Sequence, residues 1–232
     1  MNDIFGVPEV LLEIFGTYNG AIWPMQIVTY VLGIAAVILT IKKTSYSDKI
    51  ISAILAFLWL WSGVAWCLVF FGQYRFVYYV AGIMLIAQGA LLFASGFGML
   101  KPTLSFKFRS DSYSVIGILV ILYAMVIYPI IGQLTELSYP KAPIFGVAPC
   151  PVCIFTFGLL LLACKRVPAS ILVIPFMWSL LGIVAGAWFG IYADFGMAAV
   201  GIAGFVLILH RNKVSADVPG KLGSDIKQPT PA

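Results

Sequence analysis

The chain has 232 residues, of which 62% are hydrophobic and 10% are charged. Soluble domains carry roughly 25% charged residues, so this composition excludes a soluble globular protein. The net charge of +5 follows from cations placed beside apolar stretches and does not indicate nucleic-acid binding. The four cysteines are too few for a disulfide framework. We therefore expect a single domain in contact with the lipid bilayer.

Residues 1–21 form the first predicted element, an amphipathic segment on the outer face of the membrane. Pro8 suits the first turn of a helix and Gly16 suits its end, so we expect a short helix over residues 8–16. The segment does not resemble a signal peptide, because it lacks a basic start and contains acidic residues such as Glu9.

Residues 22–209 contain seven apolar stretches, and a bilayer crossing needs about 20 such residues. The stretches are residues 22–41, 50–71, 77–99, 115–132, 151–164, 167–187 and 189–209. The fifth has the shortest purely apolar part. The sequence thus predicts an all-α polytopic membrane protein with seven transmembrane helices.

Lys and Arg residues alternate strongly between the gaps that separate these stretches. The second, fourth and sixth gaps hold only Arg75 and Lys141, whereas the odd gaps and the tail hold all the others. Those others are Lys42, Lys43, Lys49, Lys101, Lys107, Arg109, Lys165, Arg166, Arg211, Lys213, Lys221 and Lys227. Because cytoplasmic loops carry the cation excess, we predict an N-out, C-in protein of the bacterial inner membrane. Residues 210–232 are predicted to be a disordered cytoplasmic tail.

The first three and last three stretches align with each other as an internal repeat. Residues 23–30 match residues 150–157, Trp59 matches Trp178, and Gly63 matches Gly182. This pattern predicts a 3+1+3 parallel arrangement with the fourth stretch as the linker, which is an architecture of membrane transporters. Apolar helices also match one another by chance, and the sequence leaves that alternative open.

The segment Cys150-Pro151-Val152-Cys153 is the sharpest local motif. Pro151 suits the first position of a helix, which would make Cys150 the N-cap and place both sulfurs on one face. The helix N-terminus would then favour the Cys150 thiolate, which is the chemistry of a redox dithiol. Buried cysteines also act as small apolar residues. A closed metal site usually needs four ligands, so we expect none.

A solute site is predicted between the two triplets of stretches. Its binding residues are Gln26, Trp59, Gln88 and Trp178, which bring amides and indoles to similar depths. Interhelical hydrogen bonding is the alternative role of Gln88. Asp194 is expected to be a solvated residue of the outer turn between the last two stretches. With no charge placed inside a span, the solute is expected to be neutral, and a carboxylate-driven proton pump is excluded.

Two prolines at matched positions, Pro24 and Pro151, are predicted hinges at the outer ends of the first and fifth stretches. The single histidine, His210, is expected to mark the cytoplasmic interface beside Arg211. One histidine excludes a haem with two histidine ligands, and we expect no cofactor.

Several short sequence blocks of this chain are similar to those of a known protein family. They are Trp23-Pro24-Met25-Gln26, Trp59-Leu60-Trp61-Ser62-Gly63-Val64, Tyr139-Pro140 with Pro143-Ile144-Phe145-Gly146, and Pro149-Cys150-Pro151 followed by Ile154-Phe155-Thr156-Phe157-Gly158. They resemble an uncharacterised bacterial membrane family known as domain of unknown function 6064. The likeness extends from about residue 5 to residue 209. It implies a multi-pass membrane protein and no particular activity.

We expect binding or transport rather than catalysis, and the leading function is a transporter or facilitator of a small neutral solute. One alternative is a membrane thiol–disulfide oxidoreductase that uses Cys150 and Cys153 as its catalytic pair. Another is an accessory subunit of a membrane complex. Replacing the two cysteines would inactivate an oxidoreductase, whereas a facilitator should tolerate the change.

Overall fold

The computed structural model describes residues 9–134 and 138–217, and its regular elements are helices. In chain order these are α1 (Glu9–Ala21), α2 (Met25–Ile41), α3 (Ser47–Trp61), η1 (Ser62–Phe71), α4 (Val77–Gly96), α5 (Ser112–Leu122), η2 (Tyr123–Ile127), α6 (Tyr128–Gln133), α7 (Pro149–Leu161), α8 (Ala169–Phe189) and α9 (Ala193–Asp217). The π-helical segments η1 and η2 continue α3 and α5 without a break. The predicted all-α class is confirmed.

Five helical stretches are long and apolar enough to cross a membrane: Ser47–Phe71, Val77–Gly96, Ser112–Gln133, Ala169–Phe189 and Ala193–Val214. They correspond to the second, third, fourth, sixth and seventh predicted spans. Helices α1 and α2 together make a sixth candidate, although the chain bends by 79° between them. The fifth predicted span is α7, which has only 13 residues. The structure therefore supports a multi-span protein with five or six long apolar helices rather than the full set of seven.

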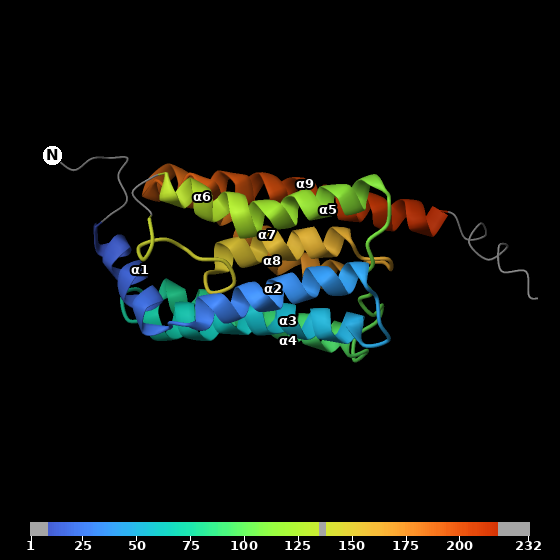
Figure 1. Ribbon diagram of the computed structural model, residues 1–232, viewed down its shortest axis with the longest axis horizontal. Helices are drawn as coiled ribbons and strands as arrows, with labels where there is room; N and C mark the ends of the chain where they lie inside the picture. Colours follow the sequence, from blue (N-terminus) through green and yellow to red (C-terminus); the bar gives the residue numbers. More distant parts are fainter. Residues whose placement is uncertain (1–8, 135–137, 218–232) are drawn as a thin grey trace, which may run out of the picture.

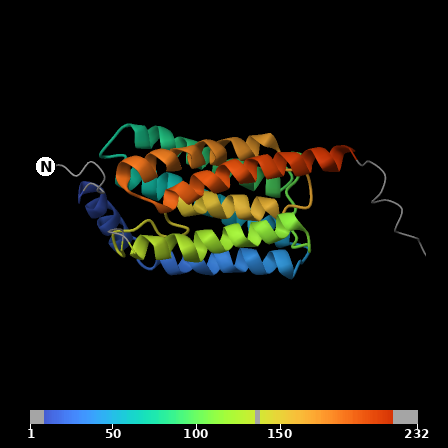
Figure 2. The same ribbon diagram turned by 90° about the horizontal axis from the view of Figure 1, so that it is seen from above.

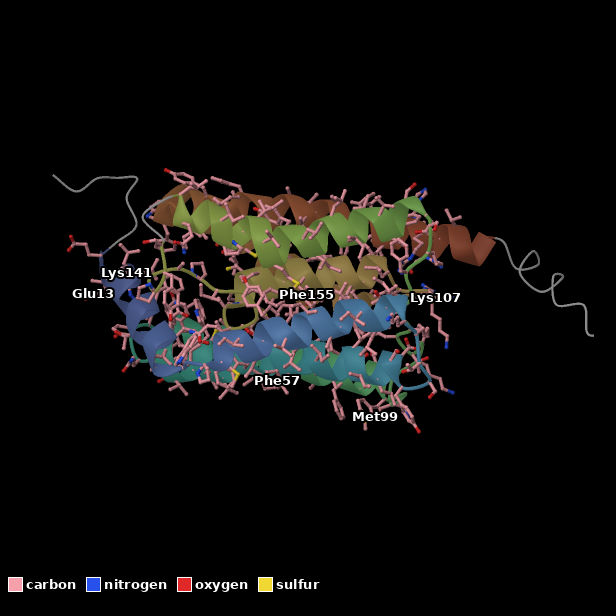
Figure 3. The ribbon with its side chains drawn as sticks, in the orientation of Figure 1. Glu13, Phe57, Met99, Lys107, Lys141 and Phe155 are labelled. Carbon is pink, nitrogen blue, oxygen red and sulfur yellow. The ribbon has the colours of Figure 1, made fainter. Side chains whose placement is uncertain are left out.

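Helix α7 lies in the middle of the bundle in both views (Figures 1 and 2). In Figure 1, α5, α6 and α9 lie above α7 and α8, and α2, α3 and α4 lie below them. Every residue from Pro151 to Leu161 is buried, and Phe155 is labelled at the centre of Figure 3. A helix that is apolar on all sides lies either inside a protein core or in lipid, and α7 lies inside the core.

The two helices predicted to be equivalent, α2 and α7, have different surroundings. Helix α2 lies on the outside and exposes apolar residues such as Val31, Ile34 and Ile38. Helix α2 packs against α3 and α3 against α4, and likewise α7 packs against α8 and α8 against α9, but α7 also packs extensively against α9. The predicted repeat thus corresponds to a similar order of helix pairs but not to two similar environments.

Helices α5 and α7 approach closely where a glycine of each faces the other. A Cβ atom on Gly117 would lie 2.8 Å from the Gly158 carbonyl oxygen, and one on Gly158 would lie 3.0 Å from that of Gly117. Real Cβ atoms do not come this close to backbone oxygens without a shift of the chain. The pair therefore sets the distance between the central helix and its neighbour.

Helix α1 lies across one end of the bundle, at the left of Figure 1. Its Tyr18 is 1% exposed, donates a hydrogen bond to the Val147 carbonyl (2.7 Å), and accepts one from the Trp61 indole (2.9 Å). Phe15 packs edge-on against Phe71. The predicted helix is therefore present, but it continues through Gly16 to Ala21 because these contacts with η1 and the 138–148 loop hold it.

The other end of the bundle joins three cation-bearing loops. The Cys164 amide donates to the Ser105 carbonyl (2.7 Å), the Phe108 amide donates to Thr40 (2.9 Å), and Lys43 Nζ donates to Ser105 Oγ (2.8 Å). Lys107 is labelled at this end in Figure 3, and Lys141 is labelled at the opposite end. The cation asymmetry of the sequence therefore appears as an asymmetry between the two ends of the molecule.

The C-terminal region differs from the prediction. The sequence predicts a disordered tail from residue 210, whereas α9 remains helical to Asp217. Its first part is held in place because Asn212 pairs with both backbone groups of Val167 at 3.1 and 2.9 Å. Residues 218–232 lie outside the described residues.

The first prediction concerns the α5–α7 contact. Gly158→Ala should lower the stability of the purified protein by about 1–3 kcal/mol, which is typical of overpacking a tight core. The measurement is the thermal unfolding midpoint in one detergent. Gly20→Ala is the matched control, because a Cβ there meets nothing within 4 Å and alanine favours a helix. Equal midpoints for the two variants would contradict the close packing.

Candidate functional site

The predicted binding residues near the bundle centre have structural partners. Trp59 is fully buried, and its Nε1 donates to Thr156 Oγ1 of α7 at 2.9 Å. Gln88 is also fully buried, and its Nε2 donates to the Ile171 carbonyl at 3.0 Å. These bonds tie α3 to α7 and α4 to α8. Of the four predicted residues, Trp178 is the one that lines the cavity described below.

The predicted hinge prolines lie at helix starts. Pro24 lies at the 79° bend between α1 and α2, where Gln26 Nε2 donates to the Asn19 carbonyl at 2.8 Å and so bridges the bend. Pro151 is the third residue of α7, because that helix begins at Pro149. The missing amide of a proline costs nothing in a first turn, whose amides have no partner within the helix.

A cavity of about 390 Å³ lies at the end of the bundle that α1 covers. Helices α4 and α8 form its sides, and residues of α1, η1, α7 and α9 complete it. Its wall is mostly apolar and includes Phe15, Ala81, Leu181, Val184 and Met197. Val184 is half exposed on the outer surface of α8, so the cavity lies close to the apolar exterior of the bundle.

The cavity wall also contains Asp194, which corrects the expectation that this residue is solvated. Asp194 is 0% exposed, and its Oδ1 accepts a hydrogen bond of 2.7 Å from the Tyr128 hydroxyl, which is itself buried. The carboxylate is inside because α9 begins at Ala193. The turn between α8 and α9 is very short, with Gly190 in the left-handed region (φ +66°), and it directs the first turn of α9 inward.

The surroundings of Asp194 explain how a carboxylate can be accommodated there. It lies in the first turn of α9, where the positive end of the helix dipole favours a negative group. Tyr123 also donates to the neighbouring Ala193 carbonyl at 2.7 Å. A Cβ on Gly182 would lie 2.3 Å from the Asp194 carbonyl oxygen, so a glycine is needed in α8 for this close approach.

Both cysteines of the motif lie near this site but face different partners. Cys150 lies beside the Asp194 carboxylate and the Trp178 indole. Cys153 is 0% exposed, and its thiol donates to the Pro175 carbonyl at 3.2 Å. The expectation that Cys150 is the N-cap is wrong, because Ala148 holds that position and Cys150 is the second residue of α7. Neither cysteine forms a disulfide bond in this structure.

Three polar atoms of the cavity-lining residues have unused hydrogen-bonding capacity. Trp66 Nε1, Trp178 Nε1 and Asp194 Oδ2 are buried and have no well-formed hydrogen bond to any described residue, although the Cys150 thiol interacts with both the Trp178 indole and the Asp194 carboxylate. Two of them are donors and one is an acceptor. Buried polar groups are normally paired, so this grouping marks the place where a polar group of a ligand could bind. Among the described residues, no group of three His, Cys, Asp or Glu side chains could hold a metal ion.

Sequence reasoning missed Asp194, Tyr128 and Trp66 as parts of this site. The available signal was that the apolar stretches 167–187 and 189–209 are separated by a single residue, so that the turn near Asp194 is short. A turn that short leaves little room for solvated residues.

The chain matches a known protein family over most of its length. Residues 8–217 match the family model described as "Family of unknown function (DUF6064)". No curated protein matches the chain. No solved structure matches it either.

The second prediction tests the buried pair of Tyr128 and Asp194. Tyr128→Phe should lower stability by about 1.5–3 kcal/mol, because it removes a hydrogen bond to a buried carboxylate. Tyr123→Phe is the matched control; it removes a bond to a backbone carbonyl and should cost about 0.5–1.5 kcal/mol. Unfolding of Tyr128→Phe, Asp194→Asn and the double variant should give a coupling energy clearly above zero. Additive effects would mean that the two side chains do not interact.

Proposed function

The chain belongs to DUF6064, a family of unknown function, and from that premise we propose that it is a multi-pass membrane protein that binds and transports a small, neutral, mainly apolar solute. The cavity beside Asp194 is the proposed binding site. The observation that supports this most directly is that Trp66, Trp178 and Asp194, whose hydrogen-bonding capacity is only partly used, lie together in an otherwise apolar wall. Such a combination of apolar surface and a few polar groups is typical of small-molecule sites.

The chemistry of the wall favours a ligand with a hydroxyl group. A hydroxyl both donates and accepts, so it could donate to Asp194 Oδ2 and accept from Trp178 Nε1. Each of these atoms is covered in this structure, so binding requires a small movement of the two side chains. The apolar remainder of the ligand would contact residues such as Leu181 and Met197.

The position of the cavity favours entry from the outer half of the bilayer. Its sides, α4 and α8, are apolar helices with exposed faces, as at Val80 and Val184. Toward the other end, Gln88 joins the same two helices, and the fully buried core around Trp59 and Phe155 fills the centre. Transport would therefore require a second state in which this core or the α4–α8 contact opens.

We further propose the predicted topology, with seven crossings, the N-terminus outside and the C-terminus in the cytoplasm of a bacterial cell. Helix α2 would be the first crossing and α7 the fifth. Helix α7 is about 20 Å long at 1.5 Å per residue, against about 30 Å of hydrocarbon. Because its neighbours shield it from lipid, it does not need the full length of a lipid-facing span.

A thiol–disulfide oxidoreductase is the second candidate, because Cys150 lines the cavity and lies close to Cys153 in the first turns of α7. The negative charge of Asp194 beside Cys150 disfavours the thiolate that such an enzyme needs. Against this candidate, the Cys153 thiol is bonded to the Pro175 carbonyl and fully buried.

The third prediction tests the solute site with a matched pair of probes, an aromatic alcohol and its methyl ether, added to the protein in nanodiscs. The alcohol should bind about tenfold more tightly, because it alone can donate to Asp194 and one such bond is worth roughly 1.4 kcal/mol. Trp178→Ala should abolish binding of the alcohol. Binding is measured by the shift of the unfolding midpoint and by tryptophan fluorescence.

Trp188→Ala is the matched control, because Trp188 is 74% exposed and lies outside the cavity lining. Equal binding by Trp178→Ala and Trp188→Ala would contradict the site. Loss of binding in Trp59→Phe but not in Trp178→Ala would instead favour a site at the bundle centre. Cys150→Ser and Cys153→Ser should keep binding; loss of a thiol-dependent activity in both would favour the oxidoreductase.

The fourth prediction concerns topology. Cys164 is exposed at the cation-bearing end, so an impermeant maleimide should label it in inverted membrane vesicles but not in intact cells. Labelling in inverted vesicles should disappear in Cys164→Ser, which serves as the control. Labelling of Cys164 in intact cells would reverse the proposed orientation.

A further inference from the structure

The cation-bearing end of the bundle contains a second cavity, separate from the solute site. It has a volume of about 210 Å³ and lies between the start of α5, the α7–α8 loop and the last turns of α9. Four cationic residues line it, namely Arg109, Lys165, Arg166 and Arg211, with a single carboxylate, Asp111. Its lining therefore has a net formal charge of +3, taking four cations and one anion.

Both oxygens of the single carboxylate already have a partner. Asp111 Oδ1 accepts from the Ser114 amide at 2.8 Å, and Oδ2 lies 3.0 Å from Arg109 Nε. Partial burial favours the neutral form of Asp111, but the hydrogen bonds from Ser114 and the charge of Arg109 outweigh it and lower its pKa. Asp111 thus N-caps α5 and orients Arg109. Its charge also attracts Arg211, but Lys165, Arg166 and Arg211 form no salt bridge with the described residues.

Arg211 shows that this cluster is more than a set of surface cations. It is 7% exposed, and its Nη1 donates to the carbonyls of Leu160 and Leu161 at 3.2 and 3.0 Å. Its Nη2 is buried and has no partner among the described residues. The positive-inside rule accounts for exposed Lys and Arg in loops, but not for a buried guanidinium that keeps donor capacity beside other cations.

We propose that this cavity binds a phosphate ester, either the headgroup of an anionic lipid or a soluble phosphate compound. Guanidinium groups are the preferred partners of phosphate, because their planar donors match its oxygens. A phosphate group would supply the acceptor that Arg211 Nη2 lacks and would neutralise the excess charge of the cavity. The neighbouring apolar surface, where Val214 is half exposed, is suited to the acyl chains of a lipid.

Cys164 lines the same cavity and is exposed, so it can report occupancy directly. The purified full-length protein is placed in phosphatidylcholine nanodiscs, with or without phosphatidic acid, at constant ionic strength. The rate of Cys164 modification by the neutral reagent N-ethylmaleimide is followed by peptide mass spectrometry. Inorganic phosphate is titrated into the phosphatidylcholine nanodiscs as the soluble probe.

We expect phosphatidic acid or inorganic phosphate to slow the modification of Cys164. Slowing by inorganic phosphate identifies a soluble phosphate site, and slowing only by phosphatidic acid identifies a lipid headgroup site. Arg166→Gln should weaken the protective ligand about tenfold, since one charge-assisted contact is worth roughly 1.4 kcal/mol or more. Lys101→Gln is the matched control, because it removes the same charge from an exposed position at the same end.

Absence of protection by both probes would overturn the proposal. Equal weakening by Arg166→Gln and Lys101→Gln would also overturn it, because that result indicates general attraction to cations rather than a site. Arg211 is not the primary test variant, since it also holds the end of α7. Arg211→Lys, read by the same protection assay in protein with an unchanged unfolding midpoint, should reduce protection because lysine cannot make the same planar contacts.

Discussion

The burial of a short central helix is the constraint on which the rest of this structure depends. A helix leaves unpaired amides at its start and unpaired carbonyls at its end, and α7 has both ends inside the protein. Helix α9 lies beside both ends, with Asp194 next to the Cys150 side chain in the first turn of α7 and Arg211 bonded to the Leu160 and Leu161 carbonyls in its last turn. An acid at the start and a cation at the end also match the dipole of α7. Seventeen residues of α9 separate the two side chains, about 25 Å at 1.5 Å per residue, so one long helix serves both ends of a shorter one.

The same difference in length accounts for the two cavities. Helix α7 has 13 residues, whereas α8 has 21 and α9 has 25. The middle of the bundle is therefore shorter than its surroundings, which leaves a recess beyond each end of α7. Cys150 lies at one recess and Cys164 lies at the other, just beyond the last turn. The recess that α1 covers is apolar with one carboxylate, and the other is cationic, so they suit ligands of different chemistry.

The parts of the fold that follow from the length of the apolar stretches and from the placement of charged residues were predictable from the sequence. The five long apolar helices, the helix before Pro24 and the separation of cations to one end all follow from local patterns. The burial of α7 was not predictable in this way, because an apolar stretch has the same residue pattern whether it faces lipid or protein. Its shortness was visible, and it was the one indication that this stretch differs from the others.

The candidate site shows a different kind of limit. Trp59 and Gln88 were predicted to bind a solute. The sequence could not show that the Trp59 indole pairs with Thr156, or that the Gln88 Nε2 pairs with Ile171 while its Oε1 has no partner among the described residues. A deep polar residue with a partner stabilises packing, and one without a partner is free to bind a ligand. Which of the two applies depends on contacts between distant segments, so only a structure shows it.

Asp194 and Arg211 illustrate why the ends of apolar stretches are the hardest positions to interpret. A charged residue at such an end is ordinarily explained by the water or headgroups that lie beyond it, and both residues fit that reading from sequence alone. Their burial, at 0% and 7% exposure, arises because the neighbouring helix ends earlier than the helix that carries them. Where adjacent helices differ in length, a charge near the end of the longer one lies beside the unpaired backbone of the shorter one. Arg211 then pairs with that backbone, whereas Asp194 pairs with the buried Tyr128 hydroxyl. The hydrogen-bonding capacity that each retains lies beside the recess that the shorter helix leaves.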